Sequence, residues 1–505
     1  MKKRILALLL SLLLLLSAYA APEGETVTAL GTEPAEAVTA PAETLPPEAP
    51  LYSFRINGVD ISRYTVVIPA DGDHFTCAAA LNIVDYFAVC LGIELELITD
   101  AEPERPYEIL LGATNRPQSA RTCALGEGQY ALFCTEGKLV LQGDSYLIGG
   151  GFGMLLRDYM DPTPPGGVID VTDLPTAPSA ADYVWAETCD SVILMIGDGM
   201  GYQQINMALD NGLDQFVAQA LPHVGAAVTC SQSVLDGDAR FTDSAAASTA
   251  LATGYKTNNG RLGLGPDGAI LLNVRELAHI MGARTAVLTT DKITGATPSG
   301  FLVHVPDRDD TEAIQTRLDA LLAAGGVDYC AGSVGDELLD RTRAALKTIS
   351  GGPFFMMIEE GQIDKRCHKA DAAGTCEMVA RFNEAVAYAV EFALCHPGTA
   401  LIVTADHETG GLTPATAKED VADLIREDCL EAHGALIAAD IARFGYAYTT
   451  YSSADTVNCT HSNVDVPLFA IGPGTERFHG VATDNTDIAR FIAAVYGATN
   501  FGQAQ

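Results

Sequence analysis

Positive charge is scarce in this chain. Its 505 residues include 30 Lys and Arg against 65 Asp and Glu, which gives a formal net charge of −35. Proteins that bind nucleic acid by neutralising the phosphate backbone need clustered positive charge, so the composition excludes that class. The hydrophobic share of 48% is that of a globular protein, and the length exceeds what one core usually fills, which predicts two domains.

Long apolar runs are scarce beyond the amino terminus. The chain begins with basic residues at 2–4, an apolar run over 5–16 and an Ala18-Tyr19-Ala20 end, the pattern of a cleaved signal peptide. The run is shorter than the about 20 residues that span a bilayer, and no later stretch reaches that length. We therefore predict a signal peptide over 1–20, no membrane span, and an extracytoplasmic protein that is secreted or associated with the cell envelope.

Cysteine pairs with metal-binding or redox spacing are missing. The 12 cysteines are too thinly spread for a disulfide scaffold, although export permits bridges. No two of them stand in the CxxC spacing of a zinc knuckle or a thioredoxin-like site. We assign them no function and leave their pairing open.

The segment that follows the signal peptide lacks aromatic and basic residues. Residues 21–50 consist almost wholly of Ala, Glu, Pro and Thr, which predicts a disordered linker. Beyond it, short strand-like runs and one amphipathic helix over 77–92 predict a small α/β accessory domain over 51–175. Its stretches YEILLGATNR and KLVLQGDSYLIGGGFGMLLRDYM resemble the small α/β domain that precedes the barrel in some glycoside hydrolases. That resemblance brings no catalytic residue with it.

A segment rich in Pro and Gly separates this domain from a longer αβ alternation over 189–497. The runs VILMIGDGMG, RTAVLTT, FFMMIEEG and ALIVTADHETG are typical of buried strands that end in polar or acidic residues. We predict an α/β fold with a large, mostly parallel central sheet and helices on both faces, preceded by the small α/β domain. In such sheets, sites lie at the carboxyl ends of the strands.

Acidic and histidine side chains gather at this predicted edge. Asp364 and His368 stand four residues apart, so on a helix they share one face and can ligate one metal ion. Taken singly, each such residue is explained as a turn Asp or a surface His. Together they predict a metal site built from Asp198, Asp364, His368, Asp406, His407 and His461.

Ser244 is the candidate nucleophile. It stands in TDSAAASTA, where an Ala-rich helix is predicted to begin, and the free amides and dipole of a helix N-terminus favour a phosphate group. The alternative is that Asp243 or Ser244 only caps the helix. The two roles are compatible.

Six blocks in order make the chain resemble the alkaline phosphatase family over residues 189–497. They are GDGMG, TDSAAASTA, ATPSGFLVHVPDR, EEGQIDKRCH, VTADHETGG and THS. The resemblance implies a phosphate monoesterase that works through a phosphoserine, with two zinc ions and one magnesium ion. It also implies a homodimer.

The resemblance assigns a role to each matched residue. It implies Ser244 as the nucleophile and Arg308 as the clamp on the phosphoryl oxygens. The implied metal ligands are Asp364, His368 and His461 for one zinc, Asp198, Asp406 and His407 for the other, and Asp198, Thr297 and Glu359 for magnesium. Mixed imidazole and carboxylate donors suit zinc, and an all-oxygen set suits magnesium.

Other functions stay open at this point. A phosphodiesterase or sulfatase of the same superfamily is one, although a diester has one fewer anionic oxygen for Arg308 and the magnesium ion to hold. Arg308 is also explained as a surface salt bridge in the acidic VPDRDD run. A protein that binds carbohydrate or cell wall through residues 51–175, with a passive phosphatase domain, is a further alternative, against which the intact ligand blocks argue.

Gly295 departs from the family pattern. The resemblance implies an Asp or His there, two residues before Thr297, to steady the magnesium ion or its waters. Because glycine has no side chain to offer, the sequence predicts a weakly held third ion, and a Gly295→Asp variant is expected to tighten it if the turn accepts a side chain.

Overall fold

The structure is a computed structural model that describes residues 53–144, 146–159, 167–335 and 337–502. The predicted signal peptide and linker lie outside these residues. All described residues belong to one compact unit, Thr39–Gln505. The predicted division into an accessory and a catalytic domain therefore stays a prediction.

A large central sheet organises the chain from residue 191 onward. It has eight strands in the order β13-β12-β14-β10-β15-β20-β11-β21, and every neighbouring pair except those with β20 is parallel. This confirms the predicted mostly parallel sheet. The strands are β10 (Ser191–Gly197), β11 (His223–Val228), β12 (Arg284–Thr289), β13 (Tyr329–Gly332), β14 (Phe354–Glu360), β15 (Thr399–Thr404), β20 (Val466–Ile471) and β21 (Ala482–Asp484).

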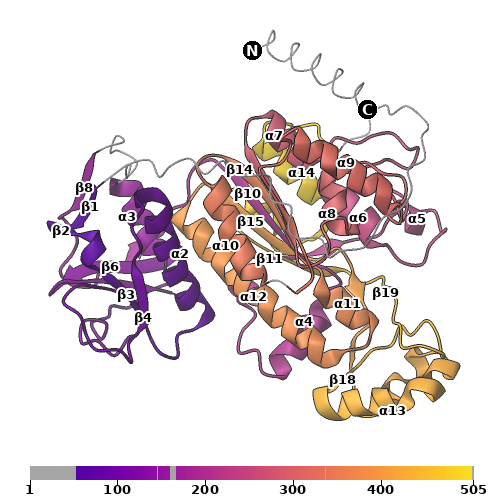
Figure 1. Ribbon diagram of the computed structural model, residues 1–505. Helices are drawn as coiled ribbons and strands as arrows, with labels where there is room; N and C mark the ends of the chain where they lie inside the picture. Colours follow the sequence, from indigo (N-terminus) through magenta and orange to yellow (C-terminus); the bar gives the residue numbers. More distant parts are fainter. Residues whose placement is uncertain (1–52, 145, 160–166, 336, 503–505) are drawn as a thin grey trace, which may run out of the picture. The chain divides into compact units, whose positions relative to one another are not determined.

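Helices cover both faces of this sheet, as predicted, because the central strands are apolar on both sides. Figure 1 shows α10 and α12 on one face and α7, α8, α9 and α14 on the other. The helices are α4 (Tyr202–Asp210), α5 (Gln232–Leu235), α6 (Ser244–Thr253), α7 (Val274–Ile280), α8 (Ala296–Leu302), α9 (Thr311–Ala323), α10 (Leu338–Ile349), α11 (Gln362–His368), α12 (Ala372–Cys395), α13 (Glu427–Phe444) and α14 (Asn485–Val495).

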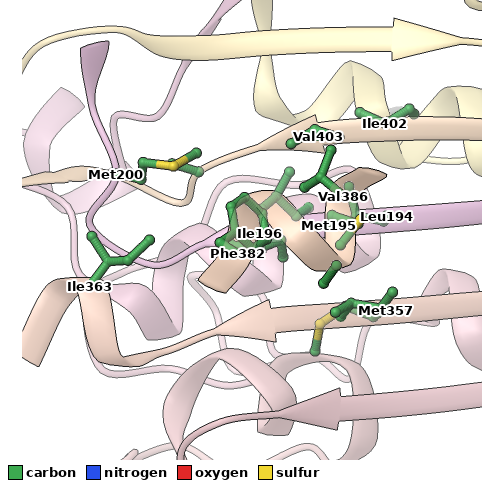
Figure 2. Packing of buried hydrophobic residues seen from close by; sticks show 14 of the residues in the cluster. Leu194, Met195, Ile196, Met200, Met357, Ile363, Phe382, Val386, Ile402 and Val403 are labelled. Carbon is green, nitrogen blue, oxygen red and sulfur yellow. The ribbon is translucent and has the colours of Figure 1, made fainter. Parts of the chain in front are cut away.

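The core between the sheet and α12 fixes the ends of the strands. Figure 2 shows Leu194 and Ile196 of β10 packed with Phe382 and Val386 of α12, and all four side chains are buried. Ile363 of α11 joins the same cluster. Burying side chains of this size stabilises the fold by about 1.5–3 kcal/mol each. The central strands and α11 therefore end at fixed positions around one edge of the sheet.

One reversed strand matters for that edge. β20 runs antiparallel to its neighbours β15 and β11. Its first residue therefore lies at the edge where the parallel strands end. A residue that precedes β20 in the chain, such as His461, can thus meet residues that follow β10, β14 and β15.

The amino-terminal part of the described chain carries its own mixed sheet, in the order β4-β3-β5-β7-β6-β9, and a small sheet β2-β1-β8. The strand-like runs of the sequence form strands here, and the predicted helix ends at Gly92 in the left-handed conformation, with φ of 63°. The elements are β1 (Ser53–Ile56), β2 (Val59–Asp60), β3 (Thr65–Ile68), β4 (Glu96–Thr99), β5 (Glu108–Leu111), β6 (Gln129–Thr135), β7 (Lys138–Gly143), β8 (Val168–Val171), β9 (Ala181–Asp182), α2 (His74–Leu91) and α3 (Gly150–Tyr159).

Within the described residues, α2 is the one helix whose length and composition would allow it to cross a membrane. Phe75, Ile83 and Phe87 of this helix are buried in the protein. A helix of a protein core passes the same test, so this is weak evidence for a membrane span.

Asp85 of α2 anchors that helix to α10 and α12. Its carboxylate accepts hydrogen bonds from Arg343 at 2.8 and 3.0 Å and from Tyr388 at 2.9 Å, and Lys347 lies 2.7 Å away. Burial raises the pKa of this carboxyl, but the bonds from Arg343 and Lys347 outweigh it and hold the pKa below its ordinary value. The carboxylate is thus charged and fully partnered in a largely buried position.

We predict that Asp85→Ala destabilises the fold by about 2 kcal/mol, measured by urea unfolding. Removing one member of a buried charge cluster costs about 3–5 kcal/mol, and the value is lower here because Arg343 and Lys347 keep 25% and 37% of their side chains exposed. Asp340→Ala is the matched control, because Asp340 lies 3.6 Å from the same Arg343 but is 73% exposed. Equal destabilisation by the two variants would contradict this role of Asp85.

Candidate active site

The predicted site residues meet at the carboxyl edge of the central sheet. Strands β10, β14 and β15 deliver Asp198, Glu359 and the pair Asp406 and His407. The other side chains come from helix starts and short segments at the same edge. These are Ser244 at the start of α6, Thr297 in α8, Arg308 after α8, Asp364 and His368 in α11, and His461 in β19 (His461–Ser462), which pairs with β16 (Glu408–Thr409).

A glycine allows the close approach that the site requires. Gly199 follows Asp198 with φ of +74°, and a Cβ atom there would lie 2.9 Å from both the Cα of Asp364 and the hydroxyl of Thr409. Its amide donates to Asp406 at 3.1 Å. Any side chain at 199 would push β10, α11 and β16 apart, so the Gly-Asp-Gly turn is a packing requirement of the site.

Asp364, His368 and His461 form one potential ligand group. The Oδ1 atom of Asp364 lies 3.2 Å from Nε2 of His368 and 3.7 Å from Nε2 of His461, and the two Nε2 atoms are 3.3 Å apart. The Nδ1 atoms face backbone carbonyls, of Cys459 for His368 and of Thr242 for His461. Both rings are thus oriented with Nε2 toward the carboxylate, as metal ligation requires.

Asp198, Asp406 and His407 form a second group. Nε2 of His407 lies 3.7 Å from Oδ1 of Asp198 and 3.2 Å from Oδ2 of Asp406. All three side chains are buried. Burial lowers the pKa of His407 to about 3, so its ring is neutral and able to ligate. His407 also approaches Asp364 and His461, which places it between the two groups.

The buried carboxylates lack the partners that their charges need. Oδ1 of Asp198 and Oδ2 of Asp406 are buried and make no hydrogen bond. Burial and then the charges of Asp406 and Asp364 raise the pKa of Asp198 well above its ordinary value, and burial and Asp364 raise that of Asp406 to about 6. Such orphaned oxygens fit cations, and the mixed nitrogen and oxygen donors of both groups suit zinc.

Thr297 and Glu359 form a third set of oxygen donors near Asp198. The hydroxyl of Thr297 is buried without a hydrogen-bond partner, although Glu359 is beside it. Burial raises the pKa of Glu359 to about 7, while the hydroxyl of Thr289, which donates to Glu359, opposes the rise. These oxygen donors, with Asp198, fit a magnesium ion rather than zinc.

Ser244 is the first residue of α6, and Asp243 is its cap. Oδ1 of Asp243 accepts the amide of Ala246 at 2.9 Å, which leaves the hydroxyl of Ser244 free of the capping role. That hydroxyl lies 3.2 Å from Nε2 of His407. The sequence alternative that Ser244 only caps the helix is thereby resolved, because Asp243 does so.

Arg308 forms an ion pair with Asp243, the residue that caps α6 and precedes Ser244. Its Nη1 lies 3.2 Å from Oδ2 of Asp243, and its backbone amide donates to Gly260, whose own amide donates to Asp243. The ion pair therefore links Arg308 to the residue before Ser244. The sequence alternative of a salt bridge inside the VPDRDD run does not match this geometry. The side chain of Arg308 is 29% exposed, so a substrate can reach it from solvent.

Sequence reasoning missed the residues that hold the ligands in place. Thr409 donates to Oδ1 of Asp364 at 2.6 Å, and Glu408 accepts from Gln204 at 2.7 Å and from Ser462 of β19. These contacts fix β16 against β19 and so position His461. The available signal was their place directly after Asp406 and His407.

A cavity of about 420 Å³ opens beside the first ligand group. Its lining includes Lys365, His368 and Lys369. Nζ of Lys365 lies 3.5 Å from Oδ2 of Asp364 and 3.7 Å from Oδ2 of Asp291. Two lysines thus border the approach to the site in a chain of strongly negative charge.

Part of the chain is similar in sequence to known proteins. A profile of the alkaline phosphatase family matches residues 190–352 and 333–428. Alkaline phosphatase 4 of Bacillus subtilis is 26% identical over 406 residues, which cover 60% of this chain and 87% of that protein. Streptomycin-6-phosphate phosphatase of Streptomyces griseus is 27% identical over 434 residues, or 64% of this chain and 94% of that protein.

A solved structure agrees on the fold. The cold-active alkaline phosphatase of a psychrophilic Shewanella species superimposes with a TM-score of 0.51 at 24% identity, covering 61% of this chain and all of the other. These similarities support the assignment of the chain to the alkaline phosphatase family. It is a hydrolase of the alkaline phosphatase superfamily. The family match begins at residue 190, so β1 to β9 lie outside it.

We predict that metal binding to the purified protein releases protons, increasingly so as the pH falls from 8 to 6. The raised pKa values of Asp406, about 6, and Glu359, about 7, mean that these carboxyls hold protons in the metal-free protein near neutrality. A cation displaces those protons, so its affinity falls as the pH falls through this window. Calorimetric titrations with zinc and magnesium, in buffers of different ionisation enthalpy, measure the release.

The raised pKa values of Asp406 and Glu359 also determine how the stability of the metal-free protein changes with pH. A carboxyl whose pKa is raised on folding destabilises the metal-free protein above that pKa, and the effect fades as the pH falls toward the unfolded value. The gain in melting temperature on adding zinc and magnesium should therefore be larger at pH 8 than at pH 5.5. Proton release that does not change with pH would contradict the raised pKa values.

Proposed function

We propose that this protein is an exported alkaline phosphatase that hydrolyses small phosphate monoesters through a phosphoserine at Ser244. One observation carries the proposal. The hydroxyl of Ser244, at the N-terminus of α6, lies beside His407, which belongs to the ligand group with Asp198 and Asp406. A serine at a helix N-terminus, next to buried ligand groups, is suited to bind and accept a phosphoryl group.

Two zinc ions and one magnesium ion complete the proposed site. Asp364, His368 and His461 would hold one zinc, and Asp198, Asp406 and His407 the other. Thr297, Glu359 and Asp198 would hold the magnesium. When bound, these ions supply Lewis acids that favour the serine alkoxide and stabilise the negative charge that develops on the phosphoryl and leaving oxygens.

The protein groups act on the substrate in two steps. The phosphoryl group lies at the N-terminus of α6, where Arg308 offers two N–H groups to its non-bridging oxygens. The oxygen of Ser244 bonds to phosphorus as the bond to the leaving oxygen breaks, and the alcohol departs. A water oxygen then attacks the phosphoserine and the bond to Ser244 breaks, which returns the hydroxyl and frees phosphate. Two in-line displacements retain the configuration at phosphorus.

The open cavity fits the leaving group of the substrate. It adjoins His368, and Lys365 and Lys369 line it. Its open form favours a range of phosphomonoesters over one dedicated substrate. We infer that the leaving group lies on this side of the site.

Diesterase and sulfatase activities are the competing proposals within the superfamily. A monoester presents a further anionic oxygen, which uses Arg308 more fully than a diester does. The test is hydrolysis of a chromogenic phosphomonoester against its diester and sulfate analogues, with and without chelator. We expect monoester hydrolysis that chelation abolishes and zinc restores, with an optimum above neutral pH. Preferred hydrolysis of the diester or sulfate, or full turnover after verified metal removal, would overturn the proposal.

Export rests on the predicted signal peptide, which lies outside the described residues. A second candidate function, carbohydrate or cell-wall binding by residues 51–175, rests on the resemblance of that segment alone. A homodimer is likewise a proposal from the family. Fractionation of cells that produce the full chain, with the mature amino terminus sequenced, tests the export.

We predict that Ser244→Ala lowers turnover by several orders of magnitude while the zinc content stays unchanged. The variant loses the hydroxyl that accepts the phosphoryl group, whereas the cap from Asp243 that starts α6 is retained. Steady-state kinetics and metal analysis on the same preparations measure this. Wild-type turnover with full zinc content would place the nucleophile elsewhere.

We predict a milder loss for Arg308→Ala, on the order of 10- to 100-fold in kcat/KM, because the ions would still bind the phosphate. Arg261→Ala is a suitable control, since the guanidinium of Arg261 donates to the backbone carbonyls of Gly265 and Pro266. Inorganic phosphate should also inhibit the Arg308 variant less than the wild type. Unchanged kinetics and inhibition would leave Arg308 as a structural partner of Asp243.

A further inference from the structure

Asp291 presents a carboxylate beside the proposed magnesium ligands, although no predicted ligand set includes it. It follows β12, and its backbone amide donates to the hydroxyl of Thr289 at 2.9 Å. The same Thr289 hydroxyl donates to Glu359. The side chain of Asp291 is 22% exposed and lines the cavity beside the site.

The carboxylate of Asp291 lies next to the place that a side chain at residue 295 would occupy. A Cβ atom built on Gly295 would lie 3.5 Å from Oδ2 of Asp291. The same atom would lie 2.9 Å from the carbonyl oxygen of Lys292, which accepts the amide of Gly295 at 2.7 Å. The tight turn over 292–295 therefore excludes a side chain at 295 and leaves the carboxylate of Asp291 beside that place.

A second glycine brings Asp291 against Glu359. A Cβ atom built on Gly361 would lie 3.0 Å from Cβ of Asp291 and 3.5 Å from Cδ of Glu359. The two acidic side chains are therefore neighbours across Gly361. The hydroxyl of Thr297, which lies beside Glu359, and Oδ1 of Asp198 are buried without a hydrogen-bond partner. Those orphaned oxygens point to a cation at this place.

We propose that Asp291 takes over the role of the side chain missing at residue 295, as the acceptor for waters of a magnesium ion held by Asp198, Thr297 and Glu359. Magnesium gives up its waters reluctantly, so a carboxylate outside its direct ligands contributes to its binding. The inference rests on the proposed function for the identity of the ion. It also revises the weak third site that Gly295 predicts, because the missing contact is supplied by another residue.

The nearby Lys365 offers an alternative partner for Asp291. Its Nζ is 3.7 Å from Oδ2 of Asp291 and 3.5 Å from Oδ2 of Asp364. If Asp291 served only to hold this lysine, then removing either side chain would affect the ion in the same way. If Asp291 supports the magnesium ion, removing the positive charge of Lys365 leaves the ion as tight as before or tighter.

The test is the magnesium affinity of zinc-loaded protein, measured by calorimetry, with metal content measured on the same samples. We expect Asp291→Asn to weaken magnesium binding by about 10-fold or more with two zinc ions retained. Lys365→Gln should bind magnesium at least as tightly as the wild type. Asp423→Asn, which removes one exposed carboxylate elsewhere, is the matched control and should match the wild type.

Four results would overturn the inference, and three of them concern magnesium binding alone. They are unchanged magnesium affinity in Asp291→Asn, equal losses in Asp291→Asn and Lys365→Gln, and a zinc-loaded wild type that binds no third ion. Loss of zinc together with magnesium in Asp291→Asn would also contradict a role confined to the third ion. Failure of the proposed function is distinguishable, because a wild type that binds the three ions but hydrolyses no phosphomonoester leaves the affinity comparison intact.

Discussion

The burial of several carboxylates close together is the constraint on which the rest of the site depends. Asp198, Asp364 and Asp406 lie at one edge of a sheet, each nearly inaccessible to water. Burying these charges together without compensation would strongly destabilise the fold. Burial first, and the neighbouring carboxylates second, raise the pKa values of Asp198 and Asp406. Cations compensate these charges more fully than protons do, since each ion can face several oxygens at once. We therefore propose that metal ions complete the site, with Ser244 and Arg308 arranged around them.

The fold meets this constraint with a few local devices. The apolar strands β10, β14 and β15 end in fixed register, so the acidic residues that follow them lie at one edge of the sheet. The reversed strand β20 brings His461 to the same edge. Gly199 allows α11 and β16 to approach the turn that carries Asp198. Asp243 caps α6 and pairs with Arg308, so one carboxylate orients both the helix that carries Ser244 and the arginine.

Much of this could be predicted from the sequence, because its signals are local. The uninterrupted apolar runs predict buried parallel strands, and the spacing of Asp364 and His368 predicts a shared helix face, as the structure has it. What the sequence could not provide are contacts between residues distant along the chain. The pairing of Arg308 with Asp243 and the hydrogen bond of Thr409 to Asp364 depend on how loops fold back over the sheet. The absence of a side chain at Gly295 was visible, whereas the carboxylate of Asp291 beside it depends on the shape of one turn.

The most direct test of this account is the number and position of metal ions in crystals of the zinc- and magnesium-loaded protein, located by anomalous scattering at the zinc absorption edge. We expect two zinc peaks, one bound by Asp364, His368 and His461 and one bound by Asp198, Asp406 and His407, with Ser244 beside the second. A single zinc peak, or zinc bound away from these two groups, would contradict it.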